Sequence, residues 1–444
     1  MTTNTPPSPQ KFHLDCNMTP SDGIARCGEP VRLNFRLLDD GQPATGVTLR
    51  CITKWEAREC ARRDFAVSDG NEEMVVEHCS ARPGWVYFAF QLLDASGELI
   101  RFPGSQIKQF TKKEEFLYEI GAIYEPENIV AIPSCPPDFD AFWDGELQRL
   151  KALPMAAQMT PVEPPGEYAG KVKAFALEVN CLGHYPVTGY VAWPEDAQPH
   201  ELPACLDLLS HVLQDVPLKS TCQEAADNHA LQMYLSWHGQ PTGHPESWYV
   251  NHKNDYYHPY QDTDDPQKWS MHEMFLRALR GLHYLKTLPQ WNRHELVVRG
   301  GSLAGIEAIA LAALDEDIDV ALINVPTGCE LNALQSGRNP TWVFRITGRA
   351  ELLDNPAVAH AVAYHDGVNF APRIKCETYV CTGLADEICF PSNVCAFYNA
   401  MTNASSKRLT ISPTSGHYGT TVNTAGDSRL ARLFKRVIVS ENRP

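Results

Sequence analysis

Residues 296–305, which read LVVRGGSLAG, decide the fold of this chain. The apolar start of this stretch predicts a buried strand, and the Ala- and Leu-rich residues 303–314 predict a helix. Ser302 therefore lies in a tight turn between strand and helix, where small neighbours allow close packing. A serine in such a turn is exposed for nucleophilic attack, and the first N–H groups of the helix, beginning with Leu303, can stabilise an oxyanion. A glycine-rich phosphate loop and a plain strand–helix turn remain the alternatives from this segment alone.

A nucleophilic serine needs a general base and an acid that orients the base. The chain carries candidates in the order serine, acid, histidine, each after an expected strand. Asp386 lies in a glycine-containing loop after the strand expected at residues 378–382, and His417 lies in a glycine-flanked loop after a short strand. We therefore predict a catalytic triad of Ser302, Asp386 and His417, with Glu387 as the rival acid.

The pattern of strand-like and helix-like segments predicts two domains. Across residues 123–444, strand-like and helix-like segments alternate, which predicts a mainly parallel sheet with helices on both faces, the α/β-hydrolase fold. Residues 12–122 show short alternating strands separated by turns, which predicts an immunoglobulin-like β-sandwich. The sandwich is a packing or oligomerisation module or, as the alternative, a carbohydrate-binding module. Residues 1–11 are rich in Thr, Pro and Ser, and we expect them to be disordered.

The composition excludes several classes of function. The 444 residues carry a net charge of −16, which argues against binding nucleic acid or an anionic membrane. No apolar run is long enough to span a bilayer, and no signal peptide is recognisable at the N-terminus. The fourteen cysteines show no CxxC spacing and no paired histidines, so neither zinc nor another metal is expected. We interpret them as reduced thiols of a cytoplasmic protein; the alternative is a few disulfides in an exported one.

Several further motifs carry a resemblance to a known family. They are PDFDAFW at residues 137–143, YHDGVNFA at residues 364–371, GLAD at residues 383–386, and the glycine–histidine pair that ends at His417. From Tyr124 to the C-terminus the chain resembles the acetyl xylan esterases and cephalosporin C deacetylases of carbohydrate esterase family 7. The resemblance implies deacetylation of sugars and similar small esters without a cofactor. It also places Ser302, Asp386 and His417 on the family's nucleophile, acid and base positions.

The chain departs from this family's pattern around the acyl pocket. His211 stands where the family has a Tyr whose backbone N–H serves the oxyanion hole, and Leu303 replaces the Gln after the nucleophile. A backbone donor survives a change of side chain, so we predict that the N–H of Leu303 and that of His211 or, as the alternative, Val212 form the oxyanion hole. The family's Arg-Gly-Gln-Gly loop reads HGQP at residues 238–241. These departures put the specificity for acetyl groups in question.

Four residues are candidates for the substrate pocket. They are Val212, Gln240, Tyr257 and Trp269. Tyr257 and Trp269 belong to an aromatic-rich stretch, residues 249–269, which forms either a lid and sugar-stacking wall or an insertion that packs on its own aromatic rings.

The sequence therefore predicts a serine esterase that removes O-acetyl groups from carbohydrates. Its partner is a small acylated sugar, with neither nucleic acid nor membrane involved, and we expect a homo-oligomer. The alternatives are an α/β-hydrolase that acts on another acyl ester or a peptide, and a non-catalytic carbohydrate-binding or scaffold protein with a decayed hydrolase domain.

Overall fold

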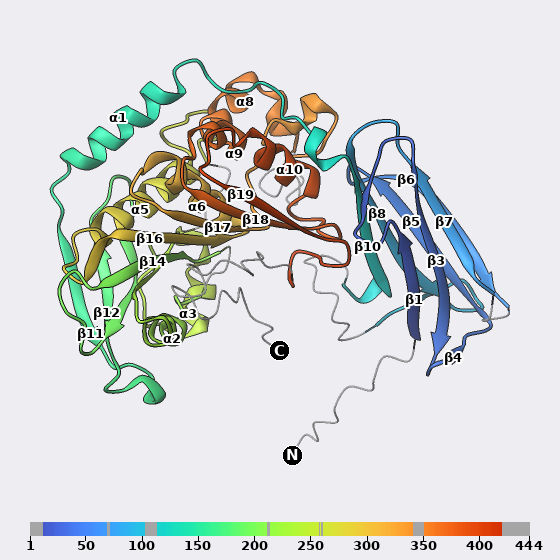
Figure 1. Cartoon of the computed structure of the whole chain (residues 1–444), viewed down its shortest axis with the longest axis horizontal. Coiled ribbons are helices and arrows are strands. Elements are labelled where there is room, and N and C mark those ends of the chain that lie inside the picture. Colours follow the sequence, from blue (N-terminus) through green and yellow to red (C-terminus); the bar gives the residue numbers. More distant parts are fainter. Residues whose placement is uncertain are drawn as a thin grey trace.

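The computed structural model of the chain describes residues 12–68, 72–102, 113–210, 214–256, 258, 261–340 and 350–419. An antiparallel β region at the N-terminus is followed by a larger region built on one nine-stranded sheet (Figure 1). Residues 1–11, for which disorder is expected, lie outside the described part.

The N-terminal region consists of two sheets. The first contains β1 (Phe12–Thr19), β3 (Pro30–Asp39), β4 (Gln42–Pro43) and β7 (Met74–Cys79). The second contains β2 (Ile24–Ala25), β5 (Val47–Trp55), β6 (Arg58–Val67), β8 (Gly84–Leu93), β9 (Leu99–Ile100) and β10 (Tyr118–Tyr124).

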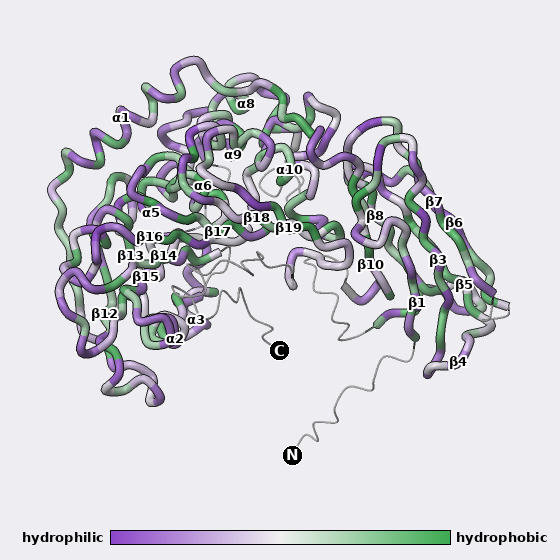
Figure 2. Tube along the Cα trace, in the orientation of Figure 1, coloured by the Kyte–Doolittle hydropathy of each residue, from purple (hydrophilic) through white to green (hydrophobic). Residues whose placement is uncertain are grey.

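The two N-terminal sheets share one apolar core. Hydrophobic and hydrophilic residues alternate along β3 (Figure 2), so that Leu33 and Phe35 point inward while their neighbours do not. These two side chains belong to the same buried cluster as Phe88 and Phe90 of the second sheet. The predicted N-terminal all-β part is confirmed.

The larger region is a nine-stranded sheet in the order β11-β12-β13-β15-β14-β16-β17-β18-β19. Its strands are β11 (Ala157–Val162), β12 (Val172–Val179), β13 (Val187–Pro194), β14 (Leu202–Leu208), β15 (Leu231–Ser236), β16 (Trp291–Gly301), β17 (Val320–Asn324), β18 (Glu377–Gly383) and β19 (Lys407–Ser412). The strands from β11 to β13 are antiparallel, and all strands from β15 to β19 in the sheet order pair in parallel.

Helices cover both faces of this sheet, as predicted. They are α1 (Phe139–Ala152), α2 (Leu218–Asn228), α3 (Glu246–Asn251), α4 (Lys253–Tyr256), α5 (Ser270–Leu285), α6 (Leu303–Leu314), α8 (Pro356–Ala363), α9 (Gly367–Phe370) and α10 (Pro391–Ala400). Successive residues of β13 show the two faces: Val191 packs in the core that contains α5, whereas Ala192 packs with Cys222 and Ala225 of α2. The mainly parallel sheet of the predicted α/β class is therefore confirmed.

Strand β16 is longer than its apolar pattern indicates. The sequence predicts a strand at residues 296–299, but β16 begins at Trp291, which pairs with Leu202 of β14. Arg293 and His294 are exposed there, so hydropathy does not mark them as strand residues. Pairing with a neighbouring strand decides the start of β16, and Ser302 follows directly at its end.

The N-terminal region packs directly against the C-terminal strands of the larger region. In Figure 1, β8 and β10 lie beside α10, β18 and β19. Alternate residues of β8 serve different cores: Phe88 belongs to the N-terminal core, whereas Trp85, Tyr87 and Ala89 belong to the core that continues into the larger region. Apolar packing therefore joins the two regions into one body.

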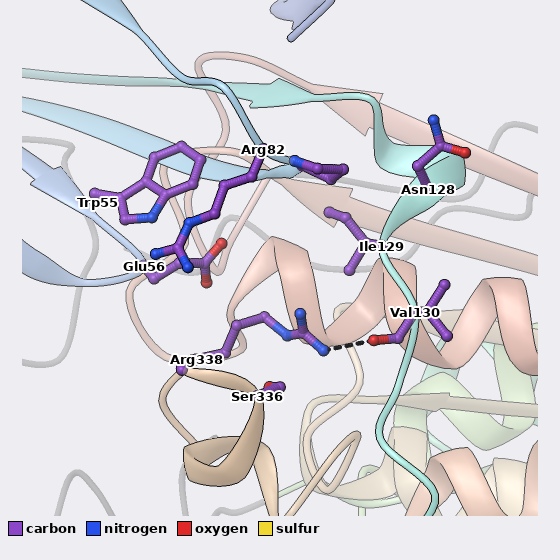
Figure 3. A pocket seen from close by; sticks show the side chains of 10 residues that line it. Trp55, Glu56, Arg82, Asn128, Ile129, Val130, Ser336 and Arg338 are labelled. Carbon is purple, nitrogen blue, oxygen red and sulfur yellow. Dashed lines mark hydrogen bonds between the residues drawn. The ribbon is translucent and has the colours of Figure 1, made fainter.

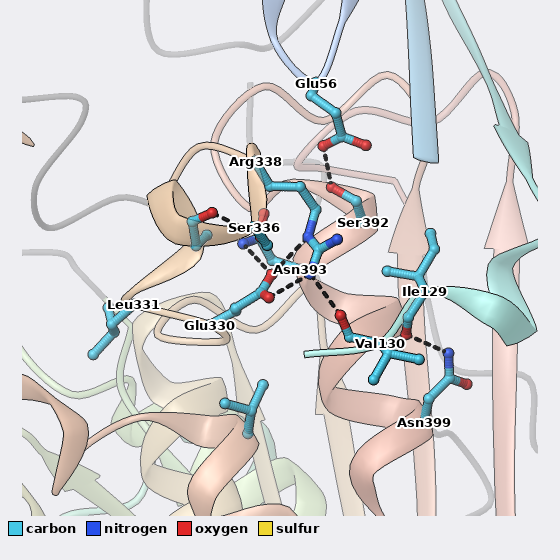
Figure 4. Close-up of polar contacts among 12 residues, drawn as sticks. Glu56, Ile129, Val130, Glu330, Leu331, Ser336, Arg338, Ser392, Asn393 and Asn399 are labelled. Atoms are coloured by element: carbon cyan, nitrogen blue, oxygen red, sulfur yellow. Dashed lines mark hydrogen bonds and ion pairs between the residues drawn. The ribbon is translucent and has the colours of Figure 1, made fainter. Parts of the chain in front are cut away.

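Buried polar groups reinforce this junction. The Glu56 carboxylate accepts a hydrogen bond from the backbone N–H of Trp85 at 2.8 Å. It accepts a second one from the Ser392 hydroxyl at 2.7 Å, which Figure 4 shows. Burial raises the pKa of Glu56, and these two hydrogen bonds act in the opposite direction. Close by, Arg338 forms an ion pair with the buried Glu330.

A cavity of about 260 Å³ lies at the same junction. Trp55, Arg82 and Arg338 are among the residues that line it (Figure 3). Neither Ser302, Asp386 nor His417 belongs to its lining, so this cavity is separate from the predicted catalytic residues.

All fourteen cysteines lie in the described part of the chain, and none is paired in a disulfide. Eight of them are buried: Cys51, Cys205, Cys222, Cys329, Cys376, Cys381, Cys389 and Cys395. Within the described ranges, no helix has both the length and the apolar character needed to cross a membrane.

Candidate active site

Ser302 occupies a strained turn between β16 and α6. Its backbone has φ 56° and ψ −118°, a conformation that residues with a side chain rarely adopt. The turn is held from the side of β17: the N–H of Ser302 donates to the carbonyl of Asn324 at 2.9 Å, and Thr327 N–H donates to the carbonyl of Ser302 at 2.9 Å. Such strain at one serine, maintained by its surroundings, is typical of a nucleophile presented for reaction.

The small residues around Ser302 are required by close packing. A Cβ atom added to Gly300 would lie 2.0 Å from the carbonyl oxygen of Ala304, and one added to Gly305 would lie 2.8 Å from Cα of Pro326. Both distances are shorter than non-bonded atoms tolerate. A larger residue at Gly300 would separate β16 from α6, and one at Gly305 would push α6 away from the segment that follows β17. The physical reason predicted for the small neighbours therefore holds at Gly300.

Asp386 and His417 lie together at the ends of β18 and β19. Nδ1 of His417 is 2.9 Å from Oδ2 of Asp386, and both side chains are buried. The other oxygen, Oδ1, accepts the backbone N–H groups of Ile388 at 2.8 Å and Cys389 at 3.0 Å. An ionised carboxylate only accepts hydrogen bonds, so in this arrangement His417 donates through Nδ1 and its Nε2 is the nitrogen that carries no proton.

Cys389 lies beside this pair. Burial raises the pKa of the Cys389 thiol well above its usual value, the negative charge of Asp386 raises it further, and the side chains of Thr327 and Ser302 oppose the shift. The potential ligand atoms of Asp386, Cys389 and His417 lie within 4.8 Å of one another. Residues that are far apart in sequence thus meet around one thiol.

The same three residues form the one His, Cys, Asp and Glu group in the described part whose atoms are close enough to share a metal ion. A thiolate, an imidazole and a carboxylate are ligands that zinc accepts. In this structure, however, the facing atoms of Asp386 and His417 already form a hydrogen bond. The arrangement is that of an acid and a base in direct contact.

Glu387, the rival acid, points to a different partner. Its carboxylate lies 2.5 Å from Nζ of Lys54 in β5. The two neighbouring carboxylates of this loop therefore have separate environments, and the geometry favours Asp386 as the partner of His417.

A second buried carboxylate lies next to this ion pair. Glu119 of β10 is 7% exposed, accepts a hydrogen bond from the Tyr87 hydroxyl, and leaves Oε2 without a hydrogen-bond partner among the described residues. Burial is the largest cause that raises its pKa to about 7; the negative charge of Glu387 raises it further, and Lys54 opposes the shift.

Glu119 is therefore expected to make stability depend on pH. Because its folded-state pKa lies above the ordinary value of 4.5, its contribution is fully present below about pH 4.5 and is lost as the pH rises through 7. Between these two pH values, the contribution of Glu119 to the free energy of unfolding changes by at most about 3 kcal/mol. Glu119→Gln keeps the shape and stays neutral, so this variant should exceed the wild type in free energy of unfolding at pH 8 but not at pH 4.5. Urea unfolding of both proteins at pH 4.5 and at pH 8 measures the free energies. A difference between variant and wild type that is the same at the two pH values would contradict the prediction.

The predicted oxyanion donors are only partly described. Leu303 is the first residue of α6, where a backbone N–H has no partner within its own helix. His211 lies outside the described residues, as does the pocket candidate Val212. Leu303 thus has the position that the prediction requires, and the donor at His211 stays a prediction.

The remaining pocket candidates lie in different surroundings. Gln240 is 1% exposed, and neither atom of its side-chain amide has a hydrogen-bond partner among the described residues. Trp269 is fully buried and packs edge-on against His365, at 5.2 Å between ring centroids. Trp269 thus packs in the core. Tyr257 lies outside the described residues.

Sequence reasoning missed the side chains that approach the Asp386 loop from the N-terminal region. The indole N–H of Trp85 donates to the carbonyl of Leu384 at 2.7 Å, across 299 positions of sequence. The apolar run around Trp85 predicts a strand but contains no signal for its partner. Only an alignment with covarying positions could have indicated such a contact in advance.

Comparison of the sequence with known proteins identifies similar acetyl esterases. The sequence profile of the family described as acetyl xylan esterase (AXE1) matches residues 124–428. The acetyl esterase Axe7A of Xylanibacter ruminicola is 24% identical over 325 residues, which cover 72% of each chain.

Solved structures show the same fold. An acetyl xylan esterase from Paenibacillus sp. R4 superposes with a TM-score of 0.57 at 22% identity, covering 67% of this chain and 94% of the other. Acetyl xylan esterase 1 from Thermoanaerobacterium sp. superposes with a TM-score of 0.56 at 19% identity, covering 70% of this chain and 96% of the other.

Proposed function

Because the chain belongs to the acetyl xylan esterase family, we propose that it hydrolyses O-acetyl esters on carbohydrates with Ser302, His417 and Asp386 as its catalytic triad. The observation that supports the proposal most directly is the 2.9 Å contact between Asp386 and His417, and the strained backbone of Ser302 between β16 and α6 adds to it. In the proposed triad these residues supply a nucleophile, a base and an orienting acid.

The proposed reaction proceeds through an acyl-enzyme. His417 accepts the hydroxyl proton of Ser302 as Oγ attacks the ester carbonyl, and Asp386 stabilises the imidazolium that forms. The N–H of Leu303, at the start of α6, stabilises the oxyanion together with the N–H of His211, and one such donor contributes about 3–4 kcal/mol to lowering the barrier. His417 then returns the proton to the leaving sugar hydroxyl. Water, activated by His417, cleaves the acetyl-enzyme to acetate and free Ser302.

The acyl and sugar specificity is tested by two series of substrates. We expect acetate release from acetylated xylo-oligosaccharides, and a rate on 4-nitrophenyl acetate at least about tenfold higher than on the butyrate ester, because a small pocket excludes longer chains. A rate that rises beyond acetyl would assign the chain to a different acyl ester. Absence of both turnover and labelling of Ser302 by a fluorophosphonate probe would favour the non-catalytic alternative.

A further inference from the structure

The loop that carries Asp386 rests on the N-terminal β region. Besides the bond from the Trp85 indole to Leu384, the Trp85 ring lies 5.7 Å from the ring of Phe390. Leu384 and Phe390 bracket Asp386, and Trp85 itself is fully buried. The β8 strand thus contacts the acid loop on both sides of the acid.

The loop that leads to His417 contacts the same region. The backbone N–H of Gly121 in β10 donates to the carbonyl of Pro413 at 2.9 Å. A Cβ atom added to Gly121 would lie only 1.9 Å from the carbonyl oxygen of Leu384, so the backbone of β10 touches both loops. A residue other than glycine would displace one of them.

The acid and base loops are also tied to each other. Leu384 N–H donates to Ser412 at 2.8 Å, and Ala385 N–H donates to Ser415 at 3.0 Å, both to backbone carbonyls. Among the described residues, β19 is the last strand of the sheet, so no other strand of that sheet borders these two loops on their outer side. The N-terminal region supports both loops.

We propose that the N-terminal β region is a positioning element for catalysis. In this role Trp85 and Gly121 hold the loops of Asp386 and His417 in the relative positions that the reaction requires. This inference rests on the proposed triad. Misplacement of reacting groups by about 1 Å can reduce turnover by about a hundredfold, so a small shift of these loops is sufficient to be measured.

The test compares two variants on opposite faces of β8. Trp85→Phe keeps an aromatic ring but removes the N–H that holds Leu384, whereas Phe88→Leu disturbs the N-terminal core on the other face. We expect Trp85→Phe to lower kcat on 4-nitrophenyl acetate about tenfold at nearly unchanged KM. We expect Phe88→Leu to lower Tm while leaving kcat within about twofold.

A pH profile distinguishes positioning from general loosening. When Asp386 is misaligned, the imidazolium of His417 is less stabilised, so the acid limb of kcat/KM should move to lower pH by about half a unit in Trp85→Phe. Equal losses of kcat in both variants with an unmoved acid limb, or a kcat of Trp85→Phe within twofold of wild type, would overturn the proposal.

Two further measurements separate a failure of this inference from a failure of the proposed acetyl specificity or of folding. The rate of Ser302 labelling by a fluorophosphonate does not require an acetyl substrate, so it tests positioning even where the proposed acetyl specificity fails; a wild type that is not labelled at all overturns both proposals. If Trp85→Phe does not fold, Lys54→Met replaces it: Lys54 is 21% exposed and holds the same loop through Glu387. This variant should reduce labelling about threefold, and unchanged labelling would contradict the inference.

Discussion

Ser302→Ala is expected to reduce acetyl ester hydrolysis by about a millionfold and to leave the fold intact. The substitution removes only the hydroxyl oxygen, so the acyl-enzyme can no longer form. Alanine keeps the Cβ atom that the left-handed backbone of residue 302 already accommodates, and the backbone hydrogen bonds to Asn324 and Thr327 persist. Acetate release from 4-nitrophenyl acetate and thermal melting followed by circular dichroism measure the two properties.

Ser392→Ala provides a matched control. Ser392 is fully buried and lies six positions after Asp386, and its hydroxyl donates to Glu56 at the junction with the N-terminal region. This variant should lose about 1–2 kcal/mol of stability and keep turnover within about twofold. Wild-type-like turnover by Ser302→Ala would exclude Ser302 as the nucleophile.

Asp386→Asn is expected to lower kcat by about 10⁴-fold, the second largest effect. The N–H groups of Ile388 and Cys389 both point at Oδ1 and hold an oxygen there, so the new amide NH₂ would face His417. Nδ1 of His417 would then have to accept a hydrogen bond, and its proton would move to Nε2, where a base is needed. Steady-state kinetics with 4-nitrophenyl acetate measure the loss.

The neighbouring acid gives the comparison for this prediction. Glu387→Gln removes a charge from the same loop, but Glu387 pairs with Lys54 and not with His417. We expect a loss of less than about tenfold, through loosening of the loop alone. If Glu387→Gln were the more damaging change, the acid of the triad would have been assigned to the wrong residue.

Local patterns predicted a large part of this architecture. The Ala- and Leu-rich helix was predicted at residues 303–314, and α6 occupies those residues. Apart from Glu307 its residues are apolar or glycine, so this helix is expected to be buried. The alternation along β3 and the order of strands and helices predicted both regions. The order of Ser302, Asp386 and His417, each after a strand of its own, predicted where the candidate site lies.

Other features depend on contacts that no local pattern contains. Asp386 contacts His417, whereas the neighbouring Glu387 contacts Lys54, which lies 333 positions from Glu387 in the sequence. Trp269 was a candidate for a substrate wall on composition, yet the fold buries it against His365. A side chain's type gives its chemistry, whereas its partners depend on which distant strands lie beside it.

The sequence alone thus determined the class of the fold, the family and the candidate nucleophile, acid and base, because periodicity and short motifs are local properties. Only the tertiary structure decided that the N-terminal region reaches the Asp386 and His417 loops through Trp85 and Gly121. The physical reason is that these contacts are made by a buried indole N–H and by a backbone without a Cβ atom. Both become specific only when two chain segments approach within hydrogen-bonding distance.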